Sequence, residues 1–339
     1  MKQKWLAVLA ASFLTHAMPS WAEEGMFYAD KTIKVIIPAS AGGSYGLYGQ
    51  LIVDHLGRHI PGDPDVVLEY MDGAGGIRAS NAVASVAARD GTVLYMMHQN
   101  APTAQLVSPD ATSYDVSEFA PIGILSAMNS VMVVRTDLGV DGVEDLAKMA
   151  VTIGATGRGS YQFIVPTLMN HFGRAEFKIV PTYSGAGEVQ LALERGEVGA
   201  SMNSLSAVQE QHDDWIDGTG IAHVILQVGT KPAPDLLEVP LLTDLAQSPS
   251  EAALYQFLSI SNAMARALVM PPETPADKVA TLRAAFGEMI TDPAFRSAAD
   301  ALQLPLDSAD HAEFSKLIST LLATPPETLD LAQSVLGEE

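Results

Sequence analysis

Residues 38–46, Pro-Ala-Ser-Ala-Gly-Gly-Ser-Tyr-Gly, form a Gly- and Ser-rich segment between two regular segments. The largely apolar segment Thr32–Ile37 before it is typical of a buried strand, and residues 47–59 after it have the apolar spacing of a helix. Strand, glycine-rich turn and helix form the opening of an α/β unit. Backbone N–H groups at such a helix N-terminus bind anions, so this segment is a candidate anion site.

A second segment of the same kind covers residues 155–161, Ala-Thr-Gly-Arg-Gly-Ser-Tyr. It follows an expected strand at 152–155 and precedes an expected helix at 161–172. In open α/β sheets, ligands bind outside the carboxyl ends of the strands. Two such loops that face each other across a cleft would present two helix N-termini, each with about half a positive charge. Such a cleft favours a ligand with more than one carboxylate.

The rest of the chain alternates between strand-like and helix-like segments. Runs of Val, Ile and Leu joined by helices are typical of a parallel sheet covered on both faces, and the fold class is therefore α/β. Further strands are expected at 65–70, 92–97, 130–135, 178–182, 198–202 and 224–228, and further helices at 77–88, 143–150 and 186–195. After residue 228 the chain is expected to be mostly helical, at 277–289, 293–301, 311–324 and 326–336.

The N-terminus has the pattern of a secretory signal peptide. Basic residues within 1–4 precede an apolar run at 5–14, and Ser20 and Ala22 are small residues at the positions that a signal peptidase reads. We expect cleavage after Ala22 and an exported protein that does not insert into a membrane. The chain has no cysteine, so its stability must come from a packed core rather than from disulfides.

The charge of the chain is strongly acidic. Its 339 residues include 40 Asp and Glu against 19 Lys and Arg, a formal net charge of −21. A surface of this kind repels nucleic acid and anionic membranes. It would also repel an anionic small molecule, unless the site is built from local dipoles and one or two well-placed cations. The length of the chain suggests two domains.

An exported serine hydrolase is one alternative. Residues 42–46 match G-x-S-x-G, the pattern of a nucleophile elbow with Ser44 as the nucleophile. In that elbow the strand runs directly into the first glycine, whereas four residues separate Ile37 from Gly42 here. No histidine of the chain stands in a setting that identifies it as the base of a triad.

Metal and cofactor sites are not expected. His55 and His59 have a helical spacing that can bind metal, but no Glu follows His55 and no third ligand is evident. Residues 73–76, Gly-Ala-Gly-Gly, fit either a second anion nest or only a turn that enters the helix at residue 77. Trp215 is expected in a solvated connection, because acidic residues precede it.

The two loops and several other segments resemble the substrate-binding proteins of tripartite tricarboxylate transporters, periplasmic receptors often called Bug proteins. The resemblance covers nearly all of the chain after about Lys31, and the order and spacing of its motifs are more specific than any one of them. These motifs are KVIIP at 34–38 leading into AGG at 41–43, GAGG at 73–76, DGTVL at 90–94, FAPIG at 119–123, TGRGS at 156–160, VPTYSG at 180–185, LERGEV at 193–198 and PDLLEVP at 234–240.

This resemblance implies a two-domain periplasmic-binding-protein fold of type II, the Venus-flytrap fold, with a ligand cleft between the lobes. Domain 1 would combine residues 26–130 with 230–339, and domain 2 would cover 131–229. The implied function is a periplasmic receptor, not an enzyme, that captures a di-/tricarboxylate or an aromatic carboxylate. Its partners would be the membrane permease subunits of the transporter. A periplasmic sensor subunit with the same fold is a further alternative.

The family holds carboxylates between the first loops of its two domains, largely through backbone N–H groups and hydroxyls. Tyr45 and Tyr161 fit either closure over the ligand or packing between the lobes, and Asn100 follows a strand that would end at the cleft. Carried onto this sequence, the ligand-binding residues are Ser40, Gly42, Gly43, Ser44, Tyr45 and Asn100 from the first lobe, and Thr156, Gly157, Arg158, Gly159, Ser160, Tyr183 and Ser184 from the second.

The sequence departs from the family at acidic positions. Gly46, Gly199 and Asn203 stand where the family commonly has Asp. Loss of acidic groups favours a plainly anionic ligand over one that carries an ammonium. Arg158, where small polar residues are more usual, agrees with this because a guanidinium can bind a carboxylate bidentately.

Overall fold

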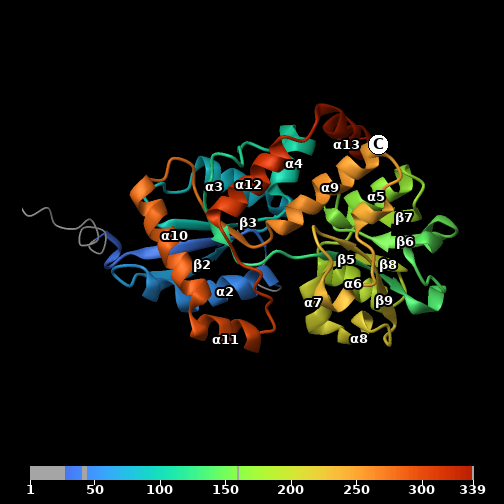
Figure 1. Ribbon diagram of the computed structural model, residues 1–339, viewed down its shortest axis with the longest axis horizontal. Coiled ribbons are helices and arrows are strands. Elements are labelled where there is room, and N and C mark those ends of the chain that lie inside the picture. The colour runs from blue at the N-terminus through green and yellow to red at the C-terminus, as the bar shows by residue number, and fades with distance from the viewer. Residues whose placement is uncertain (1–26, 40–43, 159, 338–339) are drawn as a thin grey trace, which may run out of the picture.

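The chain folds into two lobes, each built on one β-sheet (Figure 1). The computed structural model describes residues 27–39, 44–158 and 160–337. The first lobe contains a six-stranded sheet and the second lobe a five-stranded sheet. The chain passes from the first sheet to the second after β4 (Ala120–Ile124) and returns to the first with β10 (Ala267–Met270).

The first sheet has the strand order β11-β4-β10-β3-β1-β2. β1 is parallel to β2 and to β3, whereas β10 is antiparallel to β3 and β4. Because β1 and β3 are parallel neighbours, the segments that follow them begin at the same edge of the sheet. The remaining strands are β1 (Thr32–Ile37), β2 (Asp65–Tyr70), β3 (Val93–Met97) and β11 (Ala309–Asp310).

The second sheet has the order β7-β6-β8-β5-β9. β6 is parallel to β7 and β8, and β5 is antiparallel to β8 and β9. Its strands are β5 (Ser130–Arg135), β6 (Ala150–Gly154), β7 (Glu176–Val180), β8 (Ala200–Ser204) and β9 (Ala222–Val228).

One expectation from the sequence is therefore wrong. The sheets are mixed rather than parallel, because an apolar run buried on both faces does not specify the direction of its strand. The region after residue 228 is mostly helical, as expected, but the short strands β10 and β11 also return from it to the first sheet. The four residues of β10 are too few for periodicity to distinguish a strand from a helix.

Helices cover the sheets of both lobes, as Figure 1 shows. The helices of the first lobe are α2 (Ser44–Leu56), α3 (Ile77–Ser85), α4 (Ala101–Val107), α10 (Ala276–Thr291), α11 (Pro293–Ala301) and α12 (His311–Leu322). Those of the second are α5 (Tyr161–His171), α6 (Ala186–Glu194), α7 (Leu205–Gln211) and α8 (Asp213–Ile216). Short 3-10 helices are η1 (Gly57–His59), η2 (Ala74–Gly76), η3 (Pro109–Ala111), η4 (Thr136–Leu138), η5 (Val143–Ala147), η6 (Pro234–Leu236) and η7 (Leu242–Leu245).

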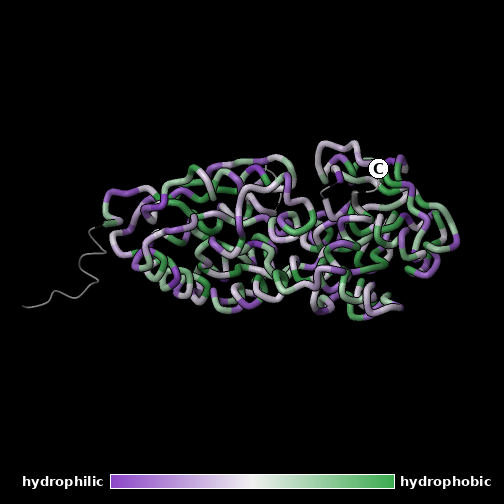
Figure 2. Tube along the Cα trace, turned by 90° about the horizontal axis from the view of Figure 1, so that it is seen from above, coloured by the Kyte–Doolittle hydropathy of each residue, from purple (hydrophilic) through white to green (hydrophobic). Residues whose placement is uncertain are grey.

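α9 (Pro249–Ala263) contacts both lobes. Near its C-terminal end, Ser261 Oγ lies 2.6 Å from Thr103 Oγ1 in the first lobe. Near its N-terminal end, Glu251 pairs with Arg174 in the second lobe. α13 (Pro326–Gly337) packs against α9, α4 and α5 in the same region. Seen from above, the two lobes form an elongated molecule with apolar segments inside each (Figure 2).

The two crossings between the lobes lie against each other. Asn129 precedes β5 and Gly229 follows β9, and a Cβ on Gly229 would overlap Asn129 Oδ1. Asn129 Nδ2 donates to Gln227 Oε1 and to the Lys231 carbonyl, both at 2.9 Å. The side chain of Asn129 thus fixes the second crossing against the first. The proposed domain division at residues 130 and 230 cuts the chain here.

Trp215 is not solvated, contrary to the expectation. It is 1% exposed and stacks on His212 with 3.8 Å between ring centroids. The acidic residues before Trp215 suggested exposure to solvent. The helix α8 is only one turn long, so no periodicity in the sequence indicated that Trp215 is buried. In the part of the chain that the structure describes, no helix is both long and apolar enough to span a membrane.

Candidate functional site

The residues predicted to bind ligand come from both lobes. Ser40, Gly42, Gly43 and Gly159 lie outside the described residues. Ser44 and Tyr45 begin α2, and Asn100 follows β3 and occupies the N-cap position of α4 without a side-chain cap hydrogen bond. Residues 156–158 and 160 connect β6 to α5, and Tyr183 and Ser184 follow β7.

A small cavity of about 100 Å³ brings some of these residues together at the junction of the lobes. Asn100 and Thr103 line it from the first lobe, and Arg158 and Tyr161 line it from the second. Asn100 is 8% exposed, and its Oδ1 has no hydrogen-bond partner among the described residues. A buried polar atom without a partner destabilises the protein by about 1–3 kcal/mol, so this oxygen is available for a donor on a ligand.

The loop between β6 and α5 is a tight turn. Gly157 has φ +137°, which side-chain-bearing residues rarely adopt. Ser160 Oγ donates to the Gly157 carbonyl at 2.7 Å, and Thr156 N–H donates to Gln162 Oε1 at 3.1 Å. Arg158 is exposed, with its guanidinium 5.5 Å from the centroid of the Phe163 ring.

The sequence left open whether Tyr45 and Tyr161 close over the ligand or pack between the lobes. In the structure the two residues have different surroundings. Tyr161 is 7% exposed, and its hydroxyl donates to the Leu258 carbonyl on α9. It is therefore a packing residue between α5 and α9 whose edge lines the small cavity. Tyr45 is half-buried, its hydroxyl accepts from Gln99 N–H at 3.0 Å, and its ring stacks on His98.

Tyr183 and Ser184 lie at the end of β7. Ser184 N–H already donates to Glu188 Oε2 at 2.8 Å, which leaves its hydroxyl as the group open to a ligand. Tyr183 packs beside Gly154, where a Cβ would come within 3.1 Å of the ring. Ring packing thus fixes Tyr183 against the end of β6.

Arg266 is the residue that sequence reasoning missed. It lies between α9 and β10, is 2% exposed, and donates from Nη2 to Ser44 Oγ at 2.5 Å. Its guanidinium carbon lies 4.0 Å from the centroid of the Tyr45 ring and 5.5 Å from that of Tyr48. The only available signal was a basic residue in an otherwise apolar run, since a buried arginine is rare unless it is paired.

The described residues around Arg266 do not neutralise its charge. Nη1 is 3.4 Å from Gln99 Oε1, Nη2 is 3.4 Å from Met128 Sδ, and Nε has no hydrogen-bond partner in the described part of the chain. No carboxylate among the described residues forms an ion pair with it. A cation–π contact contributes about 2 kcal/mol when desolvated, whereas burying an ion costs several kcal/mol. The positive N-terminal end of α2 at Ser44 adds to the excess of positive charge.

His98 shares this environment. Burial, together with the charge of Arg266, lowers the pKa of His98 to about 4. Its Nδ1 accepts from Asn100 N–H at 3.2 Å, which requires an unprotonated Nδ1. A Cβ on Gly76 would overlap His98 Cβ, so the segment 73–76 packs closely against His98 where it leads into α3. His98 is therefore neutral at physiological pH and adds no positive charge.

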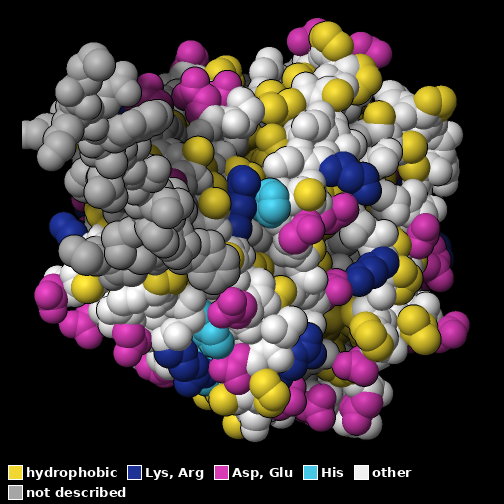
Figure 3. Space-filling view, turned by 60° about the vertical axis from the view of Figure 1, so that its left-hand side comes forward, with side chains coloured by type: hydrophobic (Ala, Val, Ile, Leu, Met, Phe, Trp, Pro, Cys, Tyr) yellow, Lys and Arg dark blue, Asp and Glu magenta, His cyan; other side chains and the backbone are white. Residues whose placement is uncertain are grey.

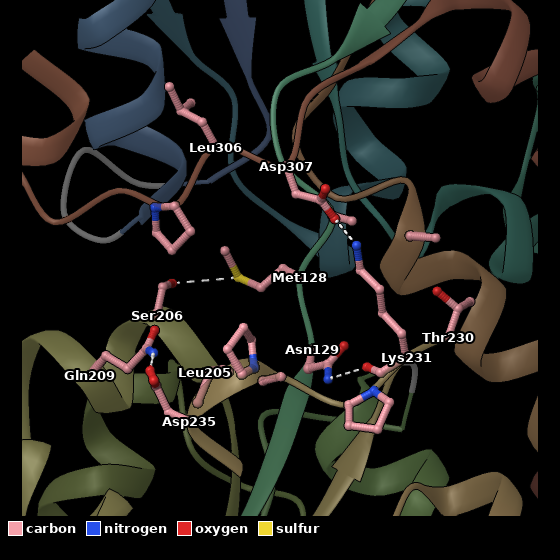
Figure 4. Close-up of a pocket in the computed structure, with 16 residues that line it drawn as sticks. Met128, Asn129, Leu205, Ser206, Gln209, Thr230, Lys231, Asp235, Leu306 and Asp307 are labelled. Carbon is pink, nitrogen blue, oxygen red and sulfur yellow. Dashed lines mark hydrogen bonds and ion pairs between the residues drawn. The ribbon is translucent and has the colours of Figure 1, made fainter. Parts of the chain in front are cut away.

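A larger cavity of about 560 Å³ also lies at the junction of the lobes (Figure 4). We call it the junction cavity. Met128, Leu306 and Asp307 line it from the first lobe, and Leu205 and Ser206 line it from α7. Its charged side chains have partners, because Lys231 Nζ lies 2.7 Å from Asp307 Oδ2 and Gln209 Nε2 donates to Asp235 Oδ2 at 2.8 Å.

The hydrolase and metal hypotheses gain no support from the geometry. Six residues separate the end of β1 from Ser44, and the hydrogen-bond partner of Ser44 Oγ among the described residues is Arg266, which cannot accept a proton. His59 lies within ion-pairing distance of Asp292, and His55 contacts Arg58 and Phe295. The described part of the chain contains no group of three potential metal ligands from His, Cys, Asp and Glu.

Comparison with known proteins places this geometry in context. No model of a known protein family matches the chain. The UPF0065 protein in the TAR-I ttuE-ttuC' intergenic region of Agrobacterium vitis is 24% identical over 218 residues. That match covers 62% of this chain and 61% of the relative, so it spans less than two thirds of the relative's length.

Two solved structures show the same architecture. The periplasmic binding protein BugD superposes with a TM-score of 0.69 at 17% identity, over 91% of this chain and 98% of its own. MatC from Rhodopseudomonas palustris with bound malate gives a TM-score of 0.63 at 20% identity, over 90% and 99% of the two chains. These similarities confirm the two-lobed periplasmic-binding-protein fold and the resemblance identified in the sequence.

Proposed function

We propose that the chain is a periplasmic substrate-binding receptor that captures a small organic anion between its lobes. It would deliver this carboxylate to the membrane permease subunits of a tripartite tricarboxylate-type transporter. The observation that carries the proposal is the junction of the lobes, where Asn100 from one lobe and Arg158 from the other line one cavity. The malate bound to MatC, which has the same fold, agrees with a carboxylate ligand.

Local groups must attract the anion, because the overall charge repels it. Acidic side chains are spread over the face seen in Figure 3, with Lys and Arg side chains among them. The N-terminal ends of α2 and α5 supply backbone N–H groups near the predicted binding residues. Together with the hydroxyls of Ser44 and Ser160, these groups would solvate a carboxylate in place of water.

The mechanism is binding with no bond made or broken. An anion held on one lobe would favour closure of the other lobe about the crossings at Asn129 and Gly229. Closure excludes water and strengthens each N–H contact to the carboxylate. The permease could then distinguish the two states, because a ligand shifts an equilibrium only toward the state that it binds more tightly.

A thermal-shift screen of the exported chain against carboxylic acids, amino acids and neutral nutrients tests this function. A ligand at a hundred times its Kd stabilises a protein by about 2.7 kcal/mol, which is visible as a shift of several degrees. A shift with one or a few carboxylates supports the receptor. No shift with any carboxylate, or a shift only with neutral compounds, contradicts it.

Ser44→Ala separates the receptor from the serine hydrolase. In a hydrolase this variant loses turnover, whereas in a receptor it weakens binding by about 1 kcal/mol for one hydrogen bond. The sensor alternative shares every binding residue with the receptor. Isolation of the membrane proteins that bind the liganded form distinguishes a permease from a signalling protein.

A further inference from the structure

Arg266 and the junction cavity meet at the side chain of Met128. Arg266 Nη2 and Ser206 Oγ both lie 3.4 Å from Met128 Sδ, one from each lobe. A thioether sulfur is a weak acceptor, so two donors converge on an atom that satisfies neither well. Figure 4 shows Met128 extending into the cavity toward Ser206.

We propose that Arg266 anchors a carboxylate of the ligand and that an uncharged, bulky apolar part of the same ligand fills the junction cavity. This inference rests on the proposed function and narrows it to one ligand class. A carboxylate oxygen takes the place of Met128 Sδ between Arg266 and Ser206. Methionine has three flexible side-chain torsions, so its side chain can move away without rearranging the backbone.

The case for an anion at Arg266 is electrostatic. Arg266 is only 2% exposed, and its nearest described polar partners, Ser44 and Gln99, are uncharged. It lies at the positive N-terminal end of the 13-residue helix α2, whose first turn contains no acidic residue. Two positive groups close to each other favour an anion beside them.

The backbone of Arg266 is also unusual. Its φ of +58° lies in the left-handed region, which a residue with a side chain seldom adopts. Strained backbone of this kind concentrates at binding sites, where the rest of the fold holds it. Here the residue in this conformation has its guanidinium against Ser44, in the interior of the protein.

The lining of the junction cavity determines what the rest of the ligand is. Ala127, Met128, Leu205, Pro305 and Leu306 give it a largely apolar wall. Its one basic side chain, Lys231, is paired with Asp307, and Asp235 adds another acidic group. A second carboxylate in this cavity would be repelled, whereas an aliphatic or aromatic body would be buried favourably.

The junction cavity is larger than a compact ligand can fill. A volume of about 560 Å³ is within the range of pockets that hold drug-sized molecules. A four-carbon dicarboxylate would leave most of it to water. Tyr48 connects Arg266 to the wall of the junction cavity. Its ring lies near Arg266, and its hydroxyl donates to the Pro305 carbonyl at 2.6 Å.

The test uses pairs of acids that differ only in an apolar body: succinate with 2-benzylsuccinate, and butanoate with 4-phenylbutanoate. Titration calorimetry on the whole exported protein measures the Kd of each. We expect the bulky member of a pair to bind at least tenfold more tightly. Tighter binding of succinate than of 2-benzylsuccinate overturns the inference but leaves the receptor function intact, whereas failure of every carboxylate to bind overturns both.

Two variants test the anchor and the cavity separately. Arg266→Gln is expected to weaken binding of the bulky acid at least tenfold. It should leave the ligand-free Tm unchanged or higher, because it removes a buried charge that has no counter-ion among the described residues. Arg283→Gln is the control for loss of an arginine in the first lobe, since Arg283 is partly buried and donates to the Pro121 carbonyl. An unchanged Kd in Arg266→Gln overturns the anchor.

Ala127→Phe fills part of the junction cavity without touching Arg266. We expect it to abolish the preference for the bulky acids and to retain binding of the compact ones. Retention of the full preference in this variant overturns the assignment of the apolar body to the cavity.

Discussion

Arg174 and Glu251 join the second lobe to the N-terminal end of α9 through a two-pronged ion pair. Arg174 Nε lies 2.8 Å from Glu251 Oε1, and Nη2 lies 2.7 Å from Oε2. The carboxylate is 1% exposed and also accepts from Gln247 N–H at 2.7 Å. One buried carboxylate therefore connects the helix that contacts both lobes to the loop after α5.

Removal of the arginine from this pair is expected to be costly. Arg174→Met leaves the Glu251 carboxylate buried without its counter-ion, and we expect the free energy of unfolding at pH 7 to fall by about 3–5 kcal/mol. The double variant Arg174→Met/Glu251→Met should recover most of the loss. A loss below about 1 kcal/mol in urea denaturation would show that the pair is not buried as described.

The pair of Arg174 and Glu251 also makes the stability of the protein depend on pH. Burial alone would raise the pKa of Glu251, but hydrogen bonds from Arg174 and from Gln247 N–H outweigh it and lower the pKa below the usual 4.5. The stability that this group contributes is therefore present above about pH 4.5 and is lost as the pH falls through the lower folded pKa. Urea denaturation should show the difference between wild type and Arg174→Met shrinking below pH 4.5.

His98 is expected to destabilise the fold in mild acid. Its folded pKa of about 4 lies below the unfolded value of 6.5, because the site is buried and Arg266 repels a second positive charge. Between pH 6.5 and 4 the unfolded chain binds a proton that the folded chain does not. Stability should fall over this range by about 3 kcal/mol from this residue. His98→Asn should show a correspondingly shallower decline, and an equal decline would contradict the assignment.

Gly229 tests the contact between the two crossings. In Gly229→Ala the new Cβ overlaps Asn129 Oδ1, whose amide is held by Gln227 and Lys231. We expect a loss of about 1–3 kcal/mol, as for overpacking. Gly287→Ala on α10 is the control, because nothing lies within 4 Å of its Cβ and a helical Gly→Ala change stabilises by about 0.5–1 kcal/mol. Equal Tm values for the two variants would contradict this account of the crossing.

Arg158 tests the contribution of the second lobe to binding. If its guanidinium contacts a ligand carboxylate, Arg158→Ala should weaken binding at least tenfold in titration calorimetry. Arg195→Ala is the control for a change of charge alone, since Arg195 is an exposed arginine at the end of α6 in the same lobe. If the two variants raise the Kd equally, Arg158 acts only through its long-range electrostatic attraction for the anion.

Much of the architecture could be predicted from the sequence. The strands β1, β2 and β5 and the helix α11 have the bounds that periodicity predicted, because each is a regular run with clear punctuation at its ends. The second Gly- and Ser-rich loop also predicted that α5 begins at Tyr161, whereas α2 begins at Ser44, before the expected start at Leu47. The helices α4, α7 and α9 were not predicted, since their mixture of small, polar and apolar residues gives no strong period.

The candidate site could be predicted only in part. The motifs identified the loops that end at the junction of the lobes, but no local pattern predicts that Arg266 lies behind Ser44, 222 residues earlier in the chain. Nor does any pattern predict that Met128 and Ser206, 78 residues apart, meet across the lobes. Such contacts depend on how β10 inserts between β3 and β4, which is a property of the whole sheet.

The sequence by itself thus determined the α/β class, the two strand–loop–helix units and the chemistry of the loops, because these follow from short-range periodicity and from backbone geometry. Only the tertiary structure decided which strands are antiparallel, how α9 connects the lobes and which cation is buried with no counter-ion among the described residues. The physical reason is that burial and charge pairing are set by residues distant in the chain, so their energies exist only once the chain has packed.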